Sequence, residues 1–171
     1  MIFMTIEEVI AHVEIRDVLA RYIRGGDRMD SELVRGVYWP DAQIKHGHTK
    51  DGVKVIERAN EHYKKHSLPA AACHHITTQY IKLDDADHAR VESYYFALWP
   101  YYDKDQAAHT GVMSGRYLDK FERRNGEWRI KERLVVQDFN RAEFLGEQWT
   151  TMSEFPRGTS TEDDPSFEFF A

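Results

Sequence analysis

The stretch Arg21-Tyr22-Ile23-Arg24-Gly25-Gly26-Asp27-Arg28-Met29-Asp30 is the part of the chain around which the predicted fold is organised. It closes a long amphipathic pattern, turns on two glycines and places the Asp27 carboxylate at the bend before a second helical segment. Tyr22 lies a little more than one helical turn before Asp27, so the phenol and the carboxylate can point into the same space. A carboxylate at such a bend is more often a solvated cap or turn residue, and that interpretation stays open.

The residues before this stretch predict one long helix. Thr5-Ile6-Glu7-Glu8 is a capping box, in which the threonine hydroxyl and the Glu8 carboxylate each accept a backbone amide of the other residue. Gly25-Gly26 is predicted to end the helix, because glycine adopts the left-handed cap conformation without steric cost. Apolar residues follow at helical spacing and form a stripe, which continues after a small phase shift: Ile6, Val9, Ile10 and Val13, then Val18, Leu19, Tyr22 and Ile23.

Three short segments are predicted between this stretch and the middle of the chain. Asp30 or Ser31 caps a second helix, which Trp39-Pro40-Asp41 stops because proline cannot continue the hydrogen-bond ladder. Asp51 caps a third helix, and Ser67-Leu68-Pro69 breaks it. The segments are a helix over 32–38, a strand over 42–46 and a helix from 52 to about 66.

From Ala72 onward the pattern changes to β-structure. Two hairpin turns are predicted at Asp84–Asp87 and at Arg123–Gly126, where Asn125-Gly126 is a strong short-range turn signal. Helices followed by long strands with tight turns indicate an α+β fold, in which a curved, mainly antiparallel sheet wraps the helices. The expected strands are His74–Leu83, Ala89–Tyr101, Ala108–Arg123 and Glu127–Asn140.

Length and composition narrow the class of protein. The chain has 171 residues, a length typical of one domain, and its 13% aromatic content predicts a bulky core or an aromatic-lined cavity. A net charge of -6 argues against nucleic acid as a partner. The start of the chain lacks the features of a signal peptide, and no apolar run is long enough to span a bilayer. We therefore expect a cytoplasmic protein with no membrane partner.

The last part of the chain differs from the rest. Residues 1–146 are predicted to form the α+β domain, and residues 147–171 a loop-rich extension containing Pro156, Gly158 and Pro165. Its aromatic end (Phe167, Phe169 and Phe170) is expected to be covered, either as a lid on a cavity or as a subunit contact.

His74 is the candidate general base. It opens a strand in which His74 and His75 face opposite sides of the sheet, so only one of them can enter a cavity. The imidazole pKa of about 6.5 suits proton transfer near neutral pH, and Asp27 would orient the ring and support its positive charge. A hydrogen-bonded structural histidine is the alternative interpretation.

Other chemistries find less support in the sequence. His46 and His48 share a strand face, but no third ligand stands at motif spacing, so we predict no metal and a pocket-rim or surface role for His46. The sequence has no nucleophile elbow, phosphate-binding loop or dinucleotide fingerprint, and no cofactor is expected. Cys73, the single cysteine, is either an activated thiol or a buried small residue.

Over roughly residues 5 to 145 the chain resembles the SnoaL-like domains of the nuclear transport factor 2-like superfamily. The resemblance lies in the order of several pieces rather than in any one motif. These are Ile15-Arg16-Asp17-Val18-Leu19-Ala20-Arg21-Tyr22, Asp27, Tyr38-Trp39-Pro40-Asp41-Ala42, His74-His75-Ile76-Thr77, Gly115-Arg116-Tyr117 and Phe121-Glu122-Arg123-Arg124-Asn125-Gly126-Glu127-Trp128. The resemblance implies an α+β cone with a deep, mostly apolar pocket, and dimers or trimers of the chain.

The resemblance also implies roles for single residues. Cofactor-independent enzymes of this superfamily include scytalone dehydratase, bile-acid 7α-dehydratase and hexachlorocyclohexane dehydrochlorinase, and Asp27 and His74 fall on their shared catalytic carboxylate and histidine. Tyr22 falls on a tyrosine of the bile-acid dehydratase. At other catalytic positions of the two dehydratases this chain carries different residues, namely Ala97, Gln137, Trp99 and His46.

These matches define an expected pocket and an expected reaction. The pocket would be lined by His46, Tyr95, Ala97, Trp99, Tyr117 and Gln137, an aromatic wall suited to a flat ligand, although the same rings would also suit a plain aromatic core. The expected function is a dehydratase-type lyase acting on a small apolar cyclic or aromatic substrate. The alternatives are an isomerase or cyclase with the same base, a non-catalytic binding or assembly module, and a subunit like the small β chain of ring-hydroxylating dioxygenases.

Overall fold

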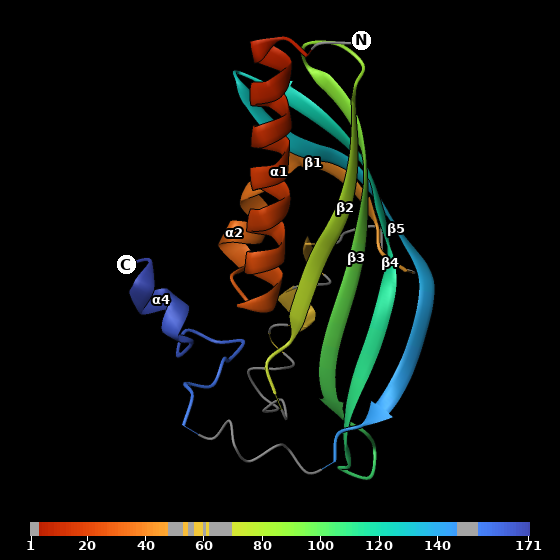
Figure 1. Cartoon of the computed structure of the whole chain (residues 1–171), viewed down its shortest axis with the longest axis vertical. Helices are drawn as coiled ribbons and strands as arrows, with labels where there is room; N and C mark the ends of the chain where they lie inside the picture. The colour runs from red at the N-terminus through yellow and green to blue at the C-terminus, as the bar shows by residue number, and fades with distance from the viewer. Residues whose placement is uncertain (1–3, 48–52, 55–56, 60, 62–69, 147–153) are drawn as a thin grey trace.

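The structure is a computed structural model that describes residues 4–47, 53–54, 57–59, 61, 70–146 and 154–171. Its strands form one mixed sheet in the order β1-β5-β4-β3-β2, and the sheet curves past α1 (Figure 1). The α+β class is confirmed, although the sheet is open rather than closed into a barrel. The elements are α1 (Ile6–Asp27), α2 (Ser31–Gly36), β1 (Tyr38–Lys45), β2 (Cys73–Leu83), β3 (His88–Tyr102), β4 (Ala108–Arg124), β5 (Glu127–Phe144) and α4 (Pro165–Phe169).

The long strands β2 to β5 pair antiparallel in chain order and confirm the expected strands. Both predicted hairpin turns are present. Asn125 and Gly126 have φ values of 53° and 85°, as a tight hairpin turn with two left-handed positions requires. β1 joins the sheet parallel to β5, and because β1 is an edge strand it accommodates Pro40.

Helix α1 begins as predicted but ends later. The capping box is present, with Thr5 N donating to Glu8 Oε2 at 2.7 Å and Glu8 N donating to Thr5 Oγ1 at 3.2 Å. The helix continues through Gly25-Gly26 to Asp27, so the prediction that the glycines end it is wrong. A Cβ at Gly25 would lie 2.7 Å from Val34 Cγ2, which shows that this glycine serves the close approach of α2.

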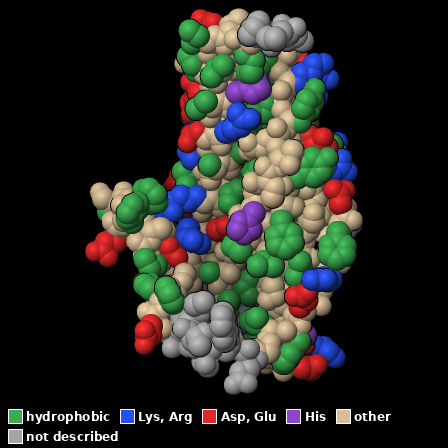
Figure 2. All heavy atoms as spheres, viewed as in Figure 1, with side chains coloured by type: hydrophobic (Ala, Val, Ile, Leu, Met, Phe, Trp, Pro, Cys, Tyr) green, Lys and Arg blue, Asp and Glu red, His purple; other side chains and the backbone are tan. Residues whose placement is uncertain are grey.

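The apolar stripe of α1 is buried only in its second half. Ile15, Val18, Leu19 and Tyr22 lie in the core, whereas the earlier members of the stripe are exposed, with Ile6 at 75% and Val13 at 60%. At 100° per residue these positions lie on the opposite side of the helix from the buried Ala11 and Ile15, and hydrophobic side chains gather on that end of the molecule (Figure 2). Only the second half of the predicted stripe therefore contributes to the core.

The segment after α1 differs in two places from the prediction. α2 ends at Gly36, and Trp39-Pro40-Asp41 lies inside strand β1 rather than at a helix stop. The helix predicted over 52–66 falls largely outside the described residues. Within that range the structure describes Val53, Lys54, 57–59 and Glu61, and all of these are helical. No helix among the described residues is long and apolar enough to cross a membrane.

The sheet has two distinct faces. Alternate residues of β3 point to the core, where Val91, Ser93, Tyr95 and Ala97 are buried. The opposite face exposes large apolar side chains, namely Tyr80, Tyr94, Phe96, Leu118, Leu134 and Phe139. The homo-oligomer expected from the sequence would bury this outer face, and the oligomer stays a prediction.

The C-terminal segment 154–171 ends in the short helix α4, which the sequence pattern did not indicate. Helix α4 lies beside the C-terminal half of α1, away from the sheet (Figure 1). Phe169 and Phe170 are 81% and 70% exposed, so the expectation that the aromatic end is covered is not met within this chain. The guanidinium of Arg24 on α1 lies over two rings of this aromatic end, those of Phe167 and Phe170.

Candidate active site

The end of α1 and the start of β2 bring Asp27 and His74 together. His74 Nδ1 lies 2.5 Å from Asp27 Oδ1, and the backbone N–H of His74 donates to Asp27 Oδ2 at 2.9 Å. Both carboxylate oxygens are therefore committed to one residue. Asp27 is buried, and a proton on Nδ1 that is donated to the carboxylate leaves Nε2 as the basic nitrogen of a neutral ring.

A cavity of about 450 Å³ opens beside this pair. Its volume lies in the range of small-molecule sites. His74 lines it, while Asp27 lines a separate groove formed by α1, Ile76 and Gln79 of β2, and Phe170. The wall is mainly aromatic and apolar, with a few polar groups: Tyr22, Ile23, Gly26, His46, Gly47, Ala59, His74, Tyr95, Trp99, Met113, Tyr117, Val135 and Gln137.

The cavity gathers most of the residues expected at a pocket. Tyr22, His46, His74, Tyr95, Trp99, Tyr117 and Gln137 all line it. Ala97 does not line it: this residue lies opposite His74 on the same face of the sheet and is fully buried. No described residue of the C-terminal segment lines the cavity, so the described part of that segment is not a lid over it.

The aromatic rings are fixed by one another. Tyr95 and Tyr117 stack with their centroids 4.7 Å apart, and Tyr22 meets Tyr117 edge-on at 5.6 Å. The ring of Trp99 meets that of His74 edge-on at 5.7 Å. Gly115 makes room for this wall, since a Cβ there would lie 2.7 Å from the Tyr95 hydroxyl oxygen.

A buried ion pair lies beneath the phenols. Arg133 and Asp119 are 2% and 3% exposed and form two parallel hydrogen bonds of 2.7 Å. Arg133 Nη1 also donates to the hydroxyl of Tyr38 at 3.1 Å. The guanidinium carbon lies 4.1 Å from the ring centre of Tyr22 and 4.3 Å from that of Tyr117, so a positive charge stands behind both rings.

The surroundings also shift proton affinities at the site. Burial raises the pKa values of Tyr95 and Tyr117, which therefore remain hydrogen-bond donors near neutral pH. His46 has an exposed edge, yet partial desolvation by the protein, reinforced by Arg133, lowers its pKa and favours the neutral ring. Burial, with help from Asp27, raises the pKa of Cys73, which opposes the activated-thiol interpretation.

Several residues of the site were missed from the sequence. Met113 and Val135 share strand parity with Tyr117 and Gln137, and this alternation could have identified them. Arg133 shares this parity with Val135 and Gln137, but an arginine on a β-strand usually points to solvent, and its burial was not expected.

The described residues contain no group of three or more His, Cys, Asp or Glu side chains arranged to hold a metal ion. His48, the partner of His46 in the metal alternative, lies outside the described residues.

The protein therefore has an α+β fold in which an open curved sheet packs on a helix, with a His–Asp pair at the wall of an aromatic cavity. The chain belongs to the SnoaL-like domain family, whose model matches residues 7–134. This places it in the nuclear transport factor 2-like superfamily, as the resemblance implied.

Solved structures of similar fold include two from Novosphingobium. A candidate scytalone dehydratase from Novosphingobium aromaticivorans superposes with a TM-score of 0.68 at 18% identity, over 85% of this chain and 100% of that one. Hexachlorocyclohexane dehydrochlorinase LinA-type3 from Novosphingobium barchaimii has a TM-score of 0.66 at 13% identity, over 84% of this chain and 96% of that one. At these identities the likeness concerns the fold alone.

A curated relative is similar in sequence. The terminal oxygenase component subunit beta 2 of terephthalate 1,2-dioxygenase from Comamonas is 29% identical over 116 residues. The match covers 66% of this chain, and the chain spans 66% of the length of that relative.

Proposed function

We propose that this protein is a cofactor-independent lyase that eliminates a leaving group, in the simplest case water, from a small apolar cyclic or aromatic substrate. The observation that carries the proposal is the contact between His74 Nδ1 and the buried Asp27 carboxylate at the wall of an aromatic cavity. The family and its structural neighbours, which include a dehydrochlorinase and a candidate dehydratase, support a small-molecule enzyme of the lyase or isomerase type.

In the proposed reaction His74 Nε2 takes a proton from a substrate carbon. The electrons of the C–H bond form the new double bond, and the leaving oxygen departs with the electrons of the C–O bond. The proton passes on to that oxygen, which leaves as water. Asp27 holds the imidazole through Nδ1 and the His74 backbone through its N–H, and it stabilises the imidazolium that forms during the step.

Tyr22 is the candidate hydrogen-bond donor to the oxygen on which negative charge develops. Its ring lines the cavity and lies on the Arg133 guanidinium, whose positive charge favours negative charge on an oxygen held at the phenol. General-base catalysis alone supplies about 10² to 10⁴ in rate, so an oxygen-directed donor is a needed second contribution.

The first experiment measures proton abstraction directly. The protein is incubated in deuterated water with cyclic ketones, hydroxysteroids and aryl-propanoid alcohols, and mass spectrometry follows deuterium uptake and product mass. We expect uptake with wild type and a decrease of about 10²-fold or more with Asp27→Asn. Loss of water with uptake identifies a dehydratase, and uptake without a mass loss identifies the isomerase or cyclase alternative.

The chain offers a matched control for Asp27→Asn. Asp85 also pairs with a histidine, as His88 Nδ1 lies 2.9 Å from Asp85 Oδ1, but that pair is exposed on the surface. Asp85→Asn should leave exchange unchanged. Activity of Asp27→Asn within twofold of wild type would refute the role of the pair.

A second candidate function rests on the curated relative, which is a β subunit of a dioxygenase. In this case the chain would be a non-catalytic subunit of a larger oxygenase. The isolated protein would then show no Asp27-dependent exchange with any substrate, and it would form a stoichiometric complex with a large oxygenase subunit in native mass spectrometry.

A further inference from the structure

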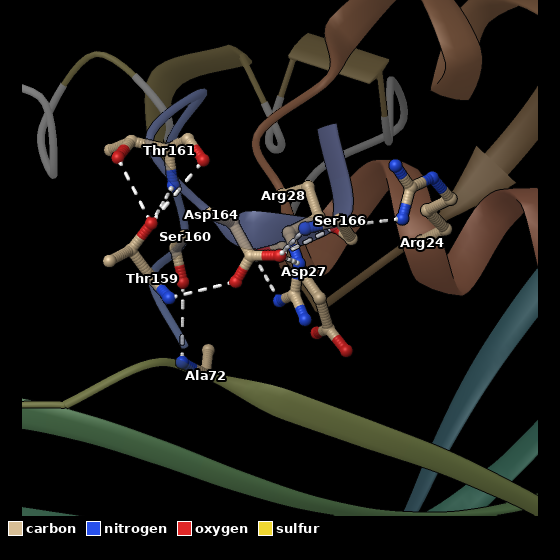
Figure 3. A network of polar contacts seen from close by, with 9 residues as sticks. All are labelled: Arg24, Asp27, Arg28, Ala72, Thr159, Ser160, Thr161, Asp164 and Ser166. Carbon is tan, nitrogen blue, oxygen red and sulfur yellow. Dashed lines mark hydrogen bonds and ion pairs between the residues drawn. The ribbon is translucent and has the colours of Figure 1, made fainter. Parts of the chain in front are cut away.

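The C-terminal segment joins the two elements that carry Asp27 and His74. Asp164 is 5% exposed, and its Oδ1 lies 3.2 Å from Arg28 Nε, next to Asp27 in the chain. Ser160 Oγ accepts a hydrogen bond from the backbone N–H of Ala72 at 3.3 Å, two residues before His74. Figure 3 shows this network from Arg24 and Arg28 across the segment to Ala72.

Asp164 is held firmly within its own segment. Its Oδ2 accepts the backbone N–H of Thr159 at 2.9 Å, and its Oδ1 accepts the N–H and the hydroxyl of Ser166 at 3.0 and 2.5 Å. Although burial opposes ionisation, these hydrogen bonds and the Arg28 charge lower the pKa of Asp164 to about 2. A fixed negative charge therefore faces Arg28 at neutral pH.

The guanidinium of Arg28 is placed where it can compete with His74 for the carboxylate of Asp27. Its Nη1 lies 3.4 Å from the backbone oxygen of Asp27, so the guanidinium is beside the residue that orients His74. Its Nε is buried and, among the described residues, has only the ion pair with Asp164 and no well-aligned hydrogen bond. Asp27 precedes Arg28 in the chain and lines the same groove, and its two carboxylate oxygens now serve His74.

We propose that Asp164 is a positioning residue that holds Arg28 and thereby leaves the Asp27 carboxylate to His74. This inference rests on the proposed function of the His74–Asp27 pair. The C-terminal segment acts on the cavity from behind, through the helix end that carries Asp27. Figure 2 shows the arginine side chains gathered where this segment meets the body of the molecule.

The test observes the hydrogen bond between His74 and Asp27 directly, without any substrate. Proteins labelled with ¹⁵N-histidine are compared by NMR for the low-field Nδ1–H resonance of His74, which His74→Gln identifies. The variants are Asp164→Asn, Arg28→Gln and the double variant, and Asp84→Asn is the control because Asp84 pairs with Arg90 on the surface. Circular dichroism and thermal unfolding show that each variant is folded.

We expect Asp164→Asn to weaken the low-field resonance and to lower deuterium exchange about 10- to 100-fold, mainly in kcat. Arg28→Gln should keep the resonance, and the double variant should regain it, since the competing cation is gone. A double variant as impaired as Asp164→Asn, or an Asp164→Asn resonance like that of wild type, overturns the proposal.

Two further outcomes are distinguishable. If Asp164→Asn does not fold, the folded Arg28→Gln variant decides the question, because loss of the resonance there means that the ion pair itself is required and overturns the proposal. If wild type catalyses no exchange, the proposed function fails, while the resonances still show whether Asp164 positions the pair.

Discussion

Single residues define the chemistry of the cavity by the partners that they have. Asp27 gives both oxygens to His74, and this fixes which imidazole nitrogen is basic. In contrast, no described residue forms a hydrogen bond with the hydroxyl of Tyr22, although the ring is held between Tyr117 and Arg133. The hydroxyl is thus available to a ligand without loss of the packing that holds the ring.

This difference leads to a prediction for Tyr22→Phe. The ring contacts remain, so the melting temperature should stay within a few degrees of wild type. Loss of a donor to a developing oxyanion costs about 10² to 10³ in kcat. Steady-state kinetics with the substrate found by exchange would measure this loss, with Tyr94→Phe on the exposed sheet face as the control. Unchanged kcat in Tyr22→Phe would remove the phenol from the mechanism.

At the scale of elements, the end of α1 is decided by the neighbouring helix. Gly25-Gly26 would suit a helix stop, but the helix continues, and the left-handed position falls on Met29 with φ of 54°. Asp30 caps α2 by accepting the N–H of Leu33 at 2.9 Å. The close crossing of α1 and α2 therefore places Asp27 on the last turn of α1 rather than in a loop.

Alanine substitutions at Gly25 and Gly26 are expected to have opposite effects on the free energy of unfolding. A Cβ at Gly25 would lie 2.7 Å from Val34 Cγ2 and 3.1 Å from the backbone oxygen of Asp30, whereas a Cβ at Gly26 would have no atom within 4 Å. Gly25→Ala should lower the free energy of unfolding by about 1–3 kcal/mol through overpacking. Gly26→Ala, the matched control, should raise it by up to about 1 kcal/mol. Urea denaturation measures both, and equal effects would contradict the packing argument.

At the scale of the whole molecule, the free energy of unfolding at acidic pH depends on how the C-terminal segment is docked. The folded-state pKa of Asp164 is about 2, below its usual value, so its contribution is present at neutral pH and is lost as pH falls from about 4 through 2. The difference in unfolding free energy between wild type and Asp164→Asn should therefore be largest above about pH 5 and shrink as the pH falls through about 2. Urea denaturation across this range checks it, and a difference independent of pH would exclude the charge as its source.

The sequence alone determined the elements that depend on short-range patterns. The capping box, the four long strands and the Asn125-Gly126 turn follow from periodicity and local backbone preference, which act over a few residues. The ordered set of motifs also indicated the family, and with it the meeting of Asp27 and His74. Strand parity placed Tyr95 and Trp99 on one face of their strand, because alternation along a strand is a local property as well, and the resemblance added Tyr117 and Gln137.

Only the tertiary structure decided which apolar residues are covered and which charges are buried. The residues Ile6 to Val13 have the same spacing as the buried residues of α1 but lie on the other side of the helix, and packing on the sheet decides which side is covered. Arg133 beneath Tyr22 and Asp164 against Arg28 depend on contacts between residues far apart in the chain. Packing of distant segments is not encoded in any local pattern, and it is this packing that builds the cavity and sets the charges around His74.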